Sequence, residues 1–104
     1  MKIDKDFLKY QYIFMIRYAF EQVAMKHNID YYFLSEFEIL EELKKVDSKY
    51  LEPLTEFVVA YYKWYKYQLK YANKNLDIRP SEKYSKLTTR KNETKINLVD
   101  ALKT

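Results

Sequence analysis

Hydrophobic side chains recur along the first quarter of the chain with the spacing of an amphipathic helix. The pattern predicts a helix from Asp4 or Asp6 to His27, which Asn28 ends in a left-handed conformation. At about 100° per residue, its apolar side chains form two stripes on different sides of the helix. One stripe consists of Phe7, Phe14, Tyr18 and Met25, and the other of Leu8, Tyr12, Ile16, Ala19, Phe20 and Val23. A helix with two apolar sides is expected at the centre of a bundle or against a second subunit.

Two further helices are predicted in the middle of the chain. The second helix falls within residues 31–46, with Ser35 as the cap of a shorter version that begins one residue later. Its apolar stripe consists of Phe33, Leu34, Phe37, Leu40 and Leu43. The third helix has Pro53 in its first turn and continues to Asn73 or Asn75. Its predicted core face consists of Leu54, Phe57, Val58, Tyr61, Tyr65, Leu69, Ala72 and Leu76.

The hydrophobic pattern weakens after the third helix. Pro80 interrupts any continuation, and residues 78–95 offer few side chains for burial. A short fourth helix is predicted later, from the spacing of Ile96, Val99 and Leu102. The sequence therefore predicts an all-α fold, with a three-helix antiparallel bundle over residues 1–76. A basic C-terminal extension with the short helix follows over residues 77–104.

Composition narrows the protein class further. A chain of 104 residues with 48% hydrophobic residues corresponds to one domain with a modest core. The absence of glycine excludes glycine-rich phosphate-binding loops, and the absence of cysteine suits a reducing compartment. The longest uncharged run, residues 10–16, is far below the roughly 18–20 residues that span a bilayer. We expect a cytoplasmic protein with no membrane association. Sixteen lysines against three arginines favour the AT-rich genome of a low-GC bacterium, its phages or its mobile elements.

Catalysis is the function that the sequence supports least. His27 is the only histidine, so a histidine-rich metal site is excluded, and a lone histidine near a helix end is more often a cap. Glu38, Glu41 and Glu42 are predicted on the outer side of the second helix, with Glu41 four residues before Lys45. The sequence therefore predicts a protein that is not an enzyme and that uses neither a cofactor nor a metal ion.

Charge is distributed unevenly along the chain. Residues 28–56 carry three bases and eight acids, whereas residues 57–104 carry eleven bases and four acids. On the third helix, a lysine stripe contains one aromatic residue, and its members are Lys63, Lys66, Tyr67, Lys70 and Lys74. Lysines around an exposed aromatic ring are typical of surfaces that contact phosphates and stack bases. A solvated helix face near a C-terminus explains the same lysines equally well.

The extension adds a second group of bases among serine, threonine and asparagine. Its candidate binding residues are Arg79, Lys83, Lys86, Arg90 and Lys91. Such a segment is typical of a tail that orders on a protein or nucleic acid. It is also compatible with a loop held over the bundle by Tyr84 and Leu87.

A candidate interface on the first helix consists of Phe14, Arg17 and Tyr18. Arg17 interrupts an apolar run and lies one turn before Glu21, so a half-buried ion pair with Glu21 is one interpretation. The other interpretation is an arginine anchor at the centre of an interface, where aromatic neighbours exclude water. The two-sided first helix favours a homodimer or a stable partner interface.

Residues 56–65, with the sequence EFVVAYYKWY, resemble the last helix of the small subunit of type III CRISPR effector complexes. The resemblance covers ten residues and lacks the glycines typical of that family.

We expect a protein-binding module, specifically a phage or mobile-element accessory protein that inhibits a host complex handling nucleic acids. The alternative is a nucleic-acid-binding protein, as a small subunit of a ribonucleoprotein complex, that uses the lysine stripe and the basic tail.

Overall fold

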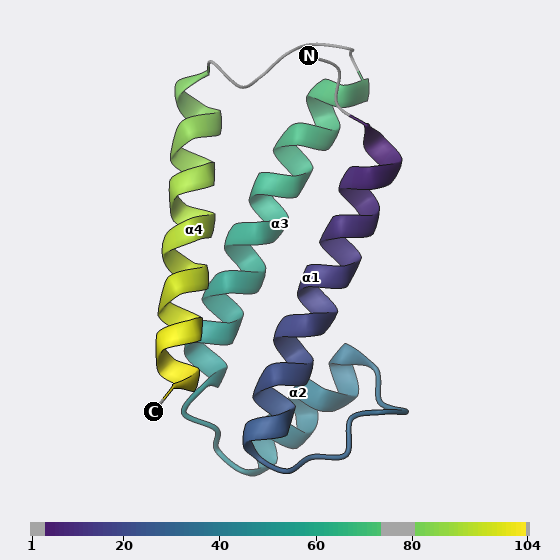
Figure 1. The fold of residues 1–104 in the computed structure, drawn as a ribbon, viewed down its shortest axis with the longest axis vertical. Helices are drawn as coiled ribbons and strands as arrows, with labels where there is room; N and C mark the ends of the chain where they lie inside the picture. The colour runs from purple at the N-terminus through teal and green to yellow at the C-terminus, as the bar shows by residue number, and fades with distance from the viewer. Residues whose placement is uncertain (1–3, 74–80, 104) are drawn as a thin grey trace.

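Four helices make up the regular structure of residues 4–73 and 81–103, which the computed structural model describes. They are α1 (Lys5–Lys26), α2 (Glu36–Lys45), α3 (Leu51–Asn73) and α4 (Glu82–Leu102) (Figure 1). No strand occurs within these two ranges, and the all-α prediction is confirmed. The predicted boundary between residues 76 and 77 lies outside the described residues, as do Lys74, Leu76 and Arg79.

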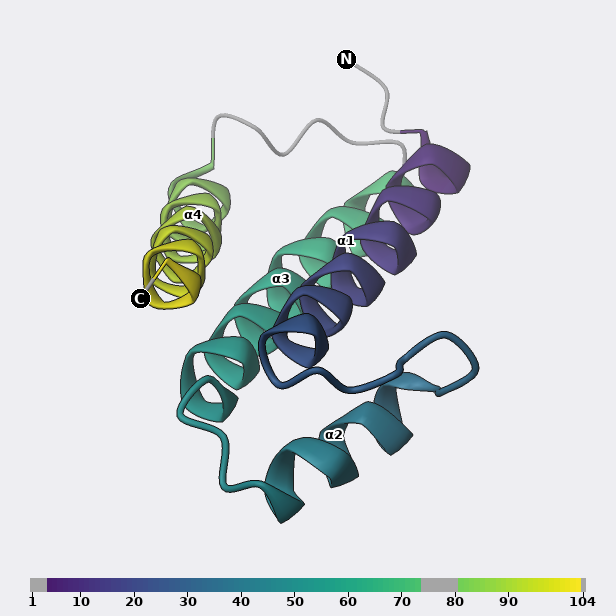
Figure 2. The ribbon, with the colours of Figure 1, turned by 60° about the horizontal axis from the view of Figure 1, so that its bottom comes forward.

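The central helix is α3. It lies between α1 and α4, and both of these run antiparallel to it (Figure 1, Figure 2). The shorter α2 lies near the C-terminal end of α1, and the molecule measures 44 × 26 × 17 Å. The prediction that the first helix occupies the centre of the bundle is therefore wrong. α1 packs on one side of α3, and α4 covers the other side.

The predicted ends of α1 are confirmed. The Asp4 carboxylate caps the helix by accepting hydrogen bonds from the backbone N–H groups of Asp6 (3.0 Å) and Phe7 (3.1 Å). At the other end, His27 is the C-cap residue and Asn28 has φ 56°. Asparagine tolerates this left-handed conformation better than most residues, which explains where the helix stops.

The two apolar stripes of α1 have different surroundings. The stripe that includes Leu8 and Val23 packs into the core, where the ring of Tyr12 stacks on Tyr65 with centroids 4.3 Å apart. The other stripe remains at least half exposed, and it comprises Phe7, Phe14, Tyr18 and Met25. The second apolar stripe, which suggested a central position for the first helix, therefore lies on the surface of the bundle.

A capping box fixes the start of α2. The Ser35 hydroxyl accepts a hydrogen bond from the backbone N–H of Glu38, and the Glu38 carboxylate accepts one from the backbone N–H of Ser35, both at 3.1 Å. This reciprocal arrangement satisfies two donors that a helix start otherwise leaves without partners. The shorter version of the second helix is confirmed.

The predicted apolar stripe of α2 is wrong at two positions. Phe33 and Phe37 are 91% and 69% exposed, whereas Ile39 and Leu43 are fully buried. Phe33 precedes the cap, so helical periodicity does not apply to it. Within the helix, burying Ile39 turns Phe37 outward, because two residues correspond to about 200° of rotation.

Two faces of α3 are buried. The predicted face is confirmed at Leu54, Phe57, Tyr61 and Tyr65, while the side chain of Ala72 lies outside the described part. A second buried face, which the prediction did not include, consists of Ala60, Trp64 and Gln68. The Trp64 indole N–H donates a hydrogen bond to the hydroxyl of Thr88 on α4 (3.1 Å). The second face therefore packs against α4.

The fourth helix is 21 residues long, so the prediction of a short helix in a basic extension is wrong. The Ser81 hydroxyl caps it by accepting a hydrogen bond from the backbone N–H of Tyr84 (3.0 Å). Thr94 is buried within it, and its hydroxyl bonds to the carbonyl groups of Arg90 and Lys91 one turn earlier. The hydroxyl therefore needs no partner outside α4, and Thr94 can occupy a buried position where an apolar residue would be expected.

The orientation of α2 leads to a stability prediction. Replacing Ile39 or Leu43 by alanine should lower the free energy of unfolding by about 2–5 kcal/mol, as expected for cavities in a packed core. Phe37→Ala should change it by only about 0.5 kcal/mol, because that side chain is largely in water. Chemical denaturation followed by circular dichroism measures all three values. A loss at Phe37 equal to that at Leu43 would contradict the observed orientation.

Candidate functional site

An aromatic surface runs along the outer side of α1. We call it the α1 aromatic face, and it consists of Phe7, Tyr10, Phe14 and Tyr18, all exposed. The rings of Phe14 and Tyr18 are nearly parallel, with centroids 6.3 Å apart, and these side chains are 58% and 50% exposed. Large aromatic side chains in a row on a rigid helix form an apolar surface of the kind found at interfaces.

A shallow concavity of about 250 Å³ lies within this face. It is lined by Tyr10, Ile13, Phe14, Arg17, Tyr18 and Glu21. The structure thus brings together the three residues predicted as an interface, Phe14, Arg17 and Tyr18. Tyr10 and Ile13 complete the concavity and were not predicted, although they lie within one turn of Phe14 on the same helix.

The Arg17 guanidinium bonds inside the molecule. Its Nε donates to the Glu21 carboxylate at 2.9 Å, and its two terminal nitrogens donate to the carbonyl groups of Leu34 (2.6 Å) and Tyr31 (3.0 Å). The carboxylate of Glu36 lies 3.7 Å away. The predicted pair with Glu21 is present, and Arg17 also fixes the segment between α1 and α2. The consequence is a firmly held edge of the α1 aromatic face.

A second surface lies between α3 and α4, and we call it the lysine groove. It has a volume of about 460 Å³ and is lined by Tyr62, Lys63, Lys66, Tyr67, Lys70, Lys83 and Leu87. The Lys83 amine lies 5.4 Å from the centre of the Tyr67 ring, and the Lys66 amine 5.9 Å from that of Tyr62. Tyr67 was expected to be exposed; it is half-buried, and its hydroxyl hydrogen-bonds to that of Ser81 (3.1 Å).

The remaining predicted basic residues lie apart from the lysine groove or outside the described chain. Lys86 pairs with Glu82 in the first turn of α4 (3.2 Å), and Arg90 lies 4.0 Å from Glu93. Because α4 is a regular helix, its bases point in several directions and do not form the continuous basic tail that the sequence suggested. Tyr62 and Leu87 complete the lysine groove, and only knowledge of how α4 packs on α3 could have identified them.

Lys91 points into the molecule. Its amine lies 3.8 Å from the centre of the Trp64 ring, a geometry that favours a cation over an aromatic face. Burial, with a smaller effect of neighbouring Lys95, lowers the pKa of Lys91. Burial also raises the pKa of nearby Tyr61 to about 12. Lys91 therefore belongs to the packing between α3 and α4.

The carboxylates that a metal site would need are engaged in local pairs. Glu38 takes part in the capping box, whose hydrogen bonds from Ser35 lower its pKa. Glu41 and Glu42 pair with Lys44 (3.3 Å) and Lys45 (3.0 Å), in place of the predicted pair of Glu41 with Lys45. No group of three potential metal ligands occurs within residues 4–73 and 81–103.

Over the same ranges, no helix combines the length and hydropathy needed to cross a bilayer.

The lone histidine connects two segments. His27 Nε2 lies 2.6 Å from the hydroxyl of Ser48, and its ring meets the edge of Tyr50. The end of α1 is thereby joined to the turn before α3.

No family model, curated protein or solved structure matches this chain.

Proposed function

We propose that this chain is a non-enzymatic protein-binding module that docks its α1 aromatic face on a partner protein. The partner is a host complex that handles nucleic acids, and the chain acts as an inhibitory accessory protein of a phage or mobile element. The observation that carries this proposal is the row of exposed aromatic side chains on α1. The proposed compartment is the host cytoplasm, in keeping with a chain that contains no cysteine.

The α1 aromatic face has the physical properties of a binding hot spot. Tyrosine and phenylalanine bury large areas with few rotatable bonds, so little conformational entropy is lost on binding. Arg17 holds the adjacent segment in place through its bonds to Tyr31 and Leu34. A surface that is already rigid before binding loses less free energy on association than a flexible one.

Charge beside this face favours a basic partner. Within the concavity Glu21 is paired with Arg17, and the neighbouring residues 30–45 carry five acids and two bases, a net negative charge. Proteins that bind nucleic acids carry basic surfaces, since they neutralise phosphates. An aromatic surface with acidic neighbours is complementary to such a surface and would compete with the nucleic acid for it.

Self-association is also part of the proposal, as the two-sided first helix led us to expect. If the α1 aromatic face receives the partner, a homodimer has to use another surface of the chain. The two functions are then compatible within one complex.

The test is a binding comparison between two variants. We expect the double substitution Phe7→Ser and Phe14→Ser to abolish partner binding, because each hot-spot residue contributes about 2 kcal/mol or more, roughly 30-fold in affinity. The partner is first isolated from nuclease-treated host lysate and purified. Its affinity is then measured by calorimetry with the wild-type and variant chains.

The matched control is Lys63→Gln with Lys66→Gln and Lys70→Gln, which alters the lysine groove only. This triple variant should retain most of the affinity, and raising salt from about 50 to 200 mM should change it little. The proposal fails if the phenylalanine variant binds like the wild type, or if nuclease treatment removes the interaction.

The second candidate function is direct nucleic-acid binding through the lysine groove. The observation that favours it is the convergence of four lysines, three from α3 and Lys83 from α4, around two tyrosine rings. Point charges beside stacking platforms are what a single strand requires. A role as a small subunit of a ribonucleoprotein complex would use the same groove.

For this second function, we expect the lysine triple variant to lose oligonucleotide binding and to retain its fold. Each lost phosphate contact should reduce the slope of log affinity against log salt by about 0.7–0.9. Titrations of labelled single- and double-stranded oligonucleotides at about 50 and 200 mM salt measure this slope. The control, Lys9→Gln with Lys44→Gln and Lys49→Gln, removes equal charge elsewhere. No binding by the wild type at the lower salt would dispose of this function.

A further inference from the structure

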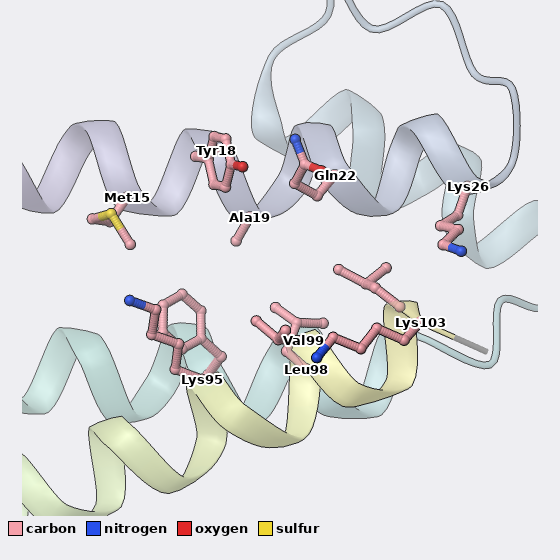
Figure 3. Close-up of a pocket in the computed structure, with 11 residues that line it drawn as sticks. Met15, Tyr18, Ala19, Gln22, Lys26, Lys95, Leu98, Val99 and Lys103 are labelled. Atoms are coloured by element: carbon pink, nitrogen blue, oxygen red, sulfur yellow. The ribbon is translucent and has the colours of Figure 1, made fainter.

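A groove separates α1 from α4 along the half of the molecule that carries α2. It has a volume of about 310 Å³, and Phe57 of α3 forms part of its lining. Its apolar walls come from Met15, Tyr18 and Ala19 on α1 and from Leu98, Val99 and Leu102 on α4 (Figure 3). The groove exists because α1 and α4 both pack on α3 and leave the space between them incompletely filled.

Lysines surround this apolar groove. Lys26 of α1 and Lys95 and Lys103 of α4 contribute to its lining (Figure 3). Asp100 lies 4.0 Å from the amine of Lys103. Within the described ranges, no carboxylate forms an ion pair with Lys26 or Lys95. An occupant of this groove should therefore carry apolar side chains flanked by acids.

The chain itself contains a segment with these properties. Phe33 and Phe37, four residues apart, are among the most exposed apolar side chains of the described chain. Residues 30–45 carry five acids and two bases, and Lys44 and Lys45 pair with Glu41 and Glu42, which leaves this segment with a net negative charge. The buried side chains Ile39 and Leu43 hold α2 on its own bundle with Phe37 turned outward. Arg17 holds the preceding segment, which carries Phe33, through the carbonyl groups of Tyr31 and Leu34.

We infer that the groove between α1 and α4 receives Phe33 and Phe37 from a second copy of this chain. The acids near these phenylalanines then approach the lysines around the groove. The groove is lined by the C-terminal halves of α1 and α4, and these lie toward the same end of the molecule as α2 (Figure 1). Two copies that meet end to end can therefore exchange this contact reciprocally, which closes a two-fold symmetric dimer.

The area of the reciprocal contact suits a dimer. An aromatic side chain buries about 150–250 Å², and the dimer inserts four phenylalanines into two grooves. With the groove surface that they cover, the contact approaches the lower limit of a specific interface, about 1,200 Å². Phe7, Tyr10 and Phe14 of the α1 aromatic face do not line this groove and remain available to a partner, whereas Tyr18 lines both surfaces.

Charge reversal tests the inference with this protein alone. One variant combines Lys26→Glu, Lys95→Glu and Lys103→Glu in the groove. The other combines Asp30→Lys, Glu41→Lys and Glu42→Lys, which leaves the capping box of Ser35 and Glu38 intact. Each variant alone places like charges across the contact. An equimolar mixture places opposite charges across both contacts.

We expect the wild type to dimerise at micromolar concentration in sedimentation equilibrium. Each variant alone should dimerise about tenfold or more weakly, and the mixture should restore a dimer with one copy of each. Thermal melts monitored by circular dichroism verify that both variants fold. A monomeric wild type, undiminished dimers of the separate variants, or a mixture without restoration would each overturn the inference.

A pair of uncharged substitutions separates this inference from the proposed function. Phe33→Ser with Phe37→Ser should give a folded monomer, since both side chains are exposed in the single chain. Phe7→Ser with Phe14→Ser should leave the dimer intact while partner binding is lost. Dimers that disappear with the second pair and persist with the first would assign self-association to the α1 aromatic face and overturn the inference.

Discussion

The burial of α3 on two sides is the constraint on which the rest of this structure depends. One side packs its tyrosines against α1, with Tyr65 stacked on Tyr12. The other side packs Trp64 against α4, where Lys91 lies over its ring and Thr88 accepts its indole N–H. α1 and α4 are therefore held by a common neighbour rather than by each other, and the bundle remains only 17 Å thick along its shortest axis.

Each candidate surface follows from this open arrangement. Among residues 4–73 and 81–103, no helix covers the outer side of α1, so its phenylalanines and tyrosines are exposed. The space between α1 and α4 becomes the apolar groove that Lys26, Lys95 and Lys103 surround. The lysine groove lies on the other side, where α4 packs on α3. An acidic α2 at one end and lysines along α3 and α4 give these surfaces different electrostatic preferences. We propose that one small chain in this way binds a partner and a second copy through two surfaces that meet at Tyr18.

The sequence predicted the features that depend on local chemistry. The Asp4 and Asn28 ends of α1 and the capping box at Ser35 follow from short-range hydrogen bonds, and the structure confirms them. The errors arose where tertiary packing decides. α4 has few apolar residues, and burial of Thr94 depends on its bonds to its own helix, which no hydrophobic pattern reveals. The lysine stripe of α3 was recognised, but its partner wall from α4 was not, because that wall exists only once the helices pack.

The most direct test of this account is the free energy of unfolding of a shortened chain that ends at Leu76. If α3 needs α4 to cover its second face, this chain should lose its cooperative unfolding transition. The emission of Trp64, the only tryptophan, should shift toward that of an indole in water. Denaturant titration of both chains, followed by tryptophan fluorescence and circular dichroism, makes the comparison. A shortened chain that unfolds cooperatively with the free energy of the full chain would contradict the central role of the α3–α4 contact.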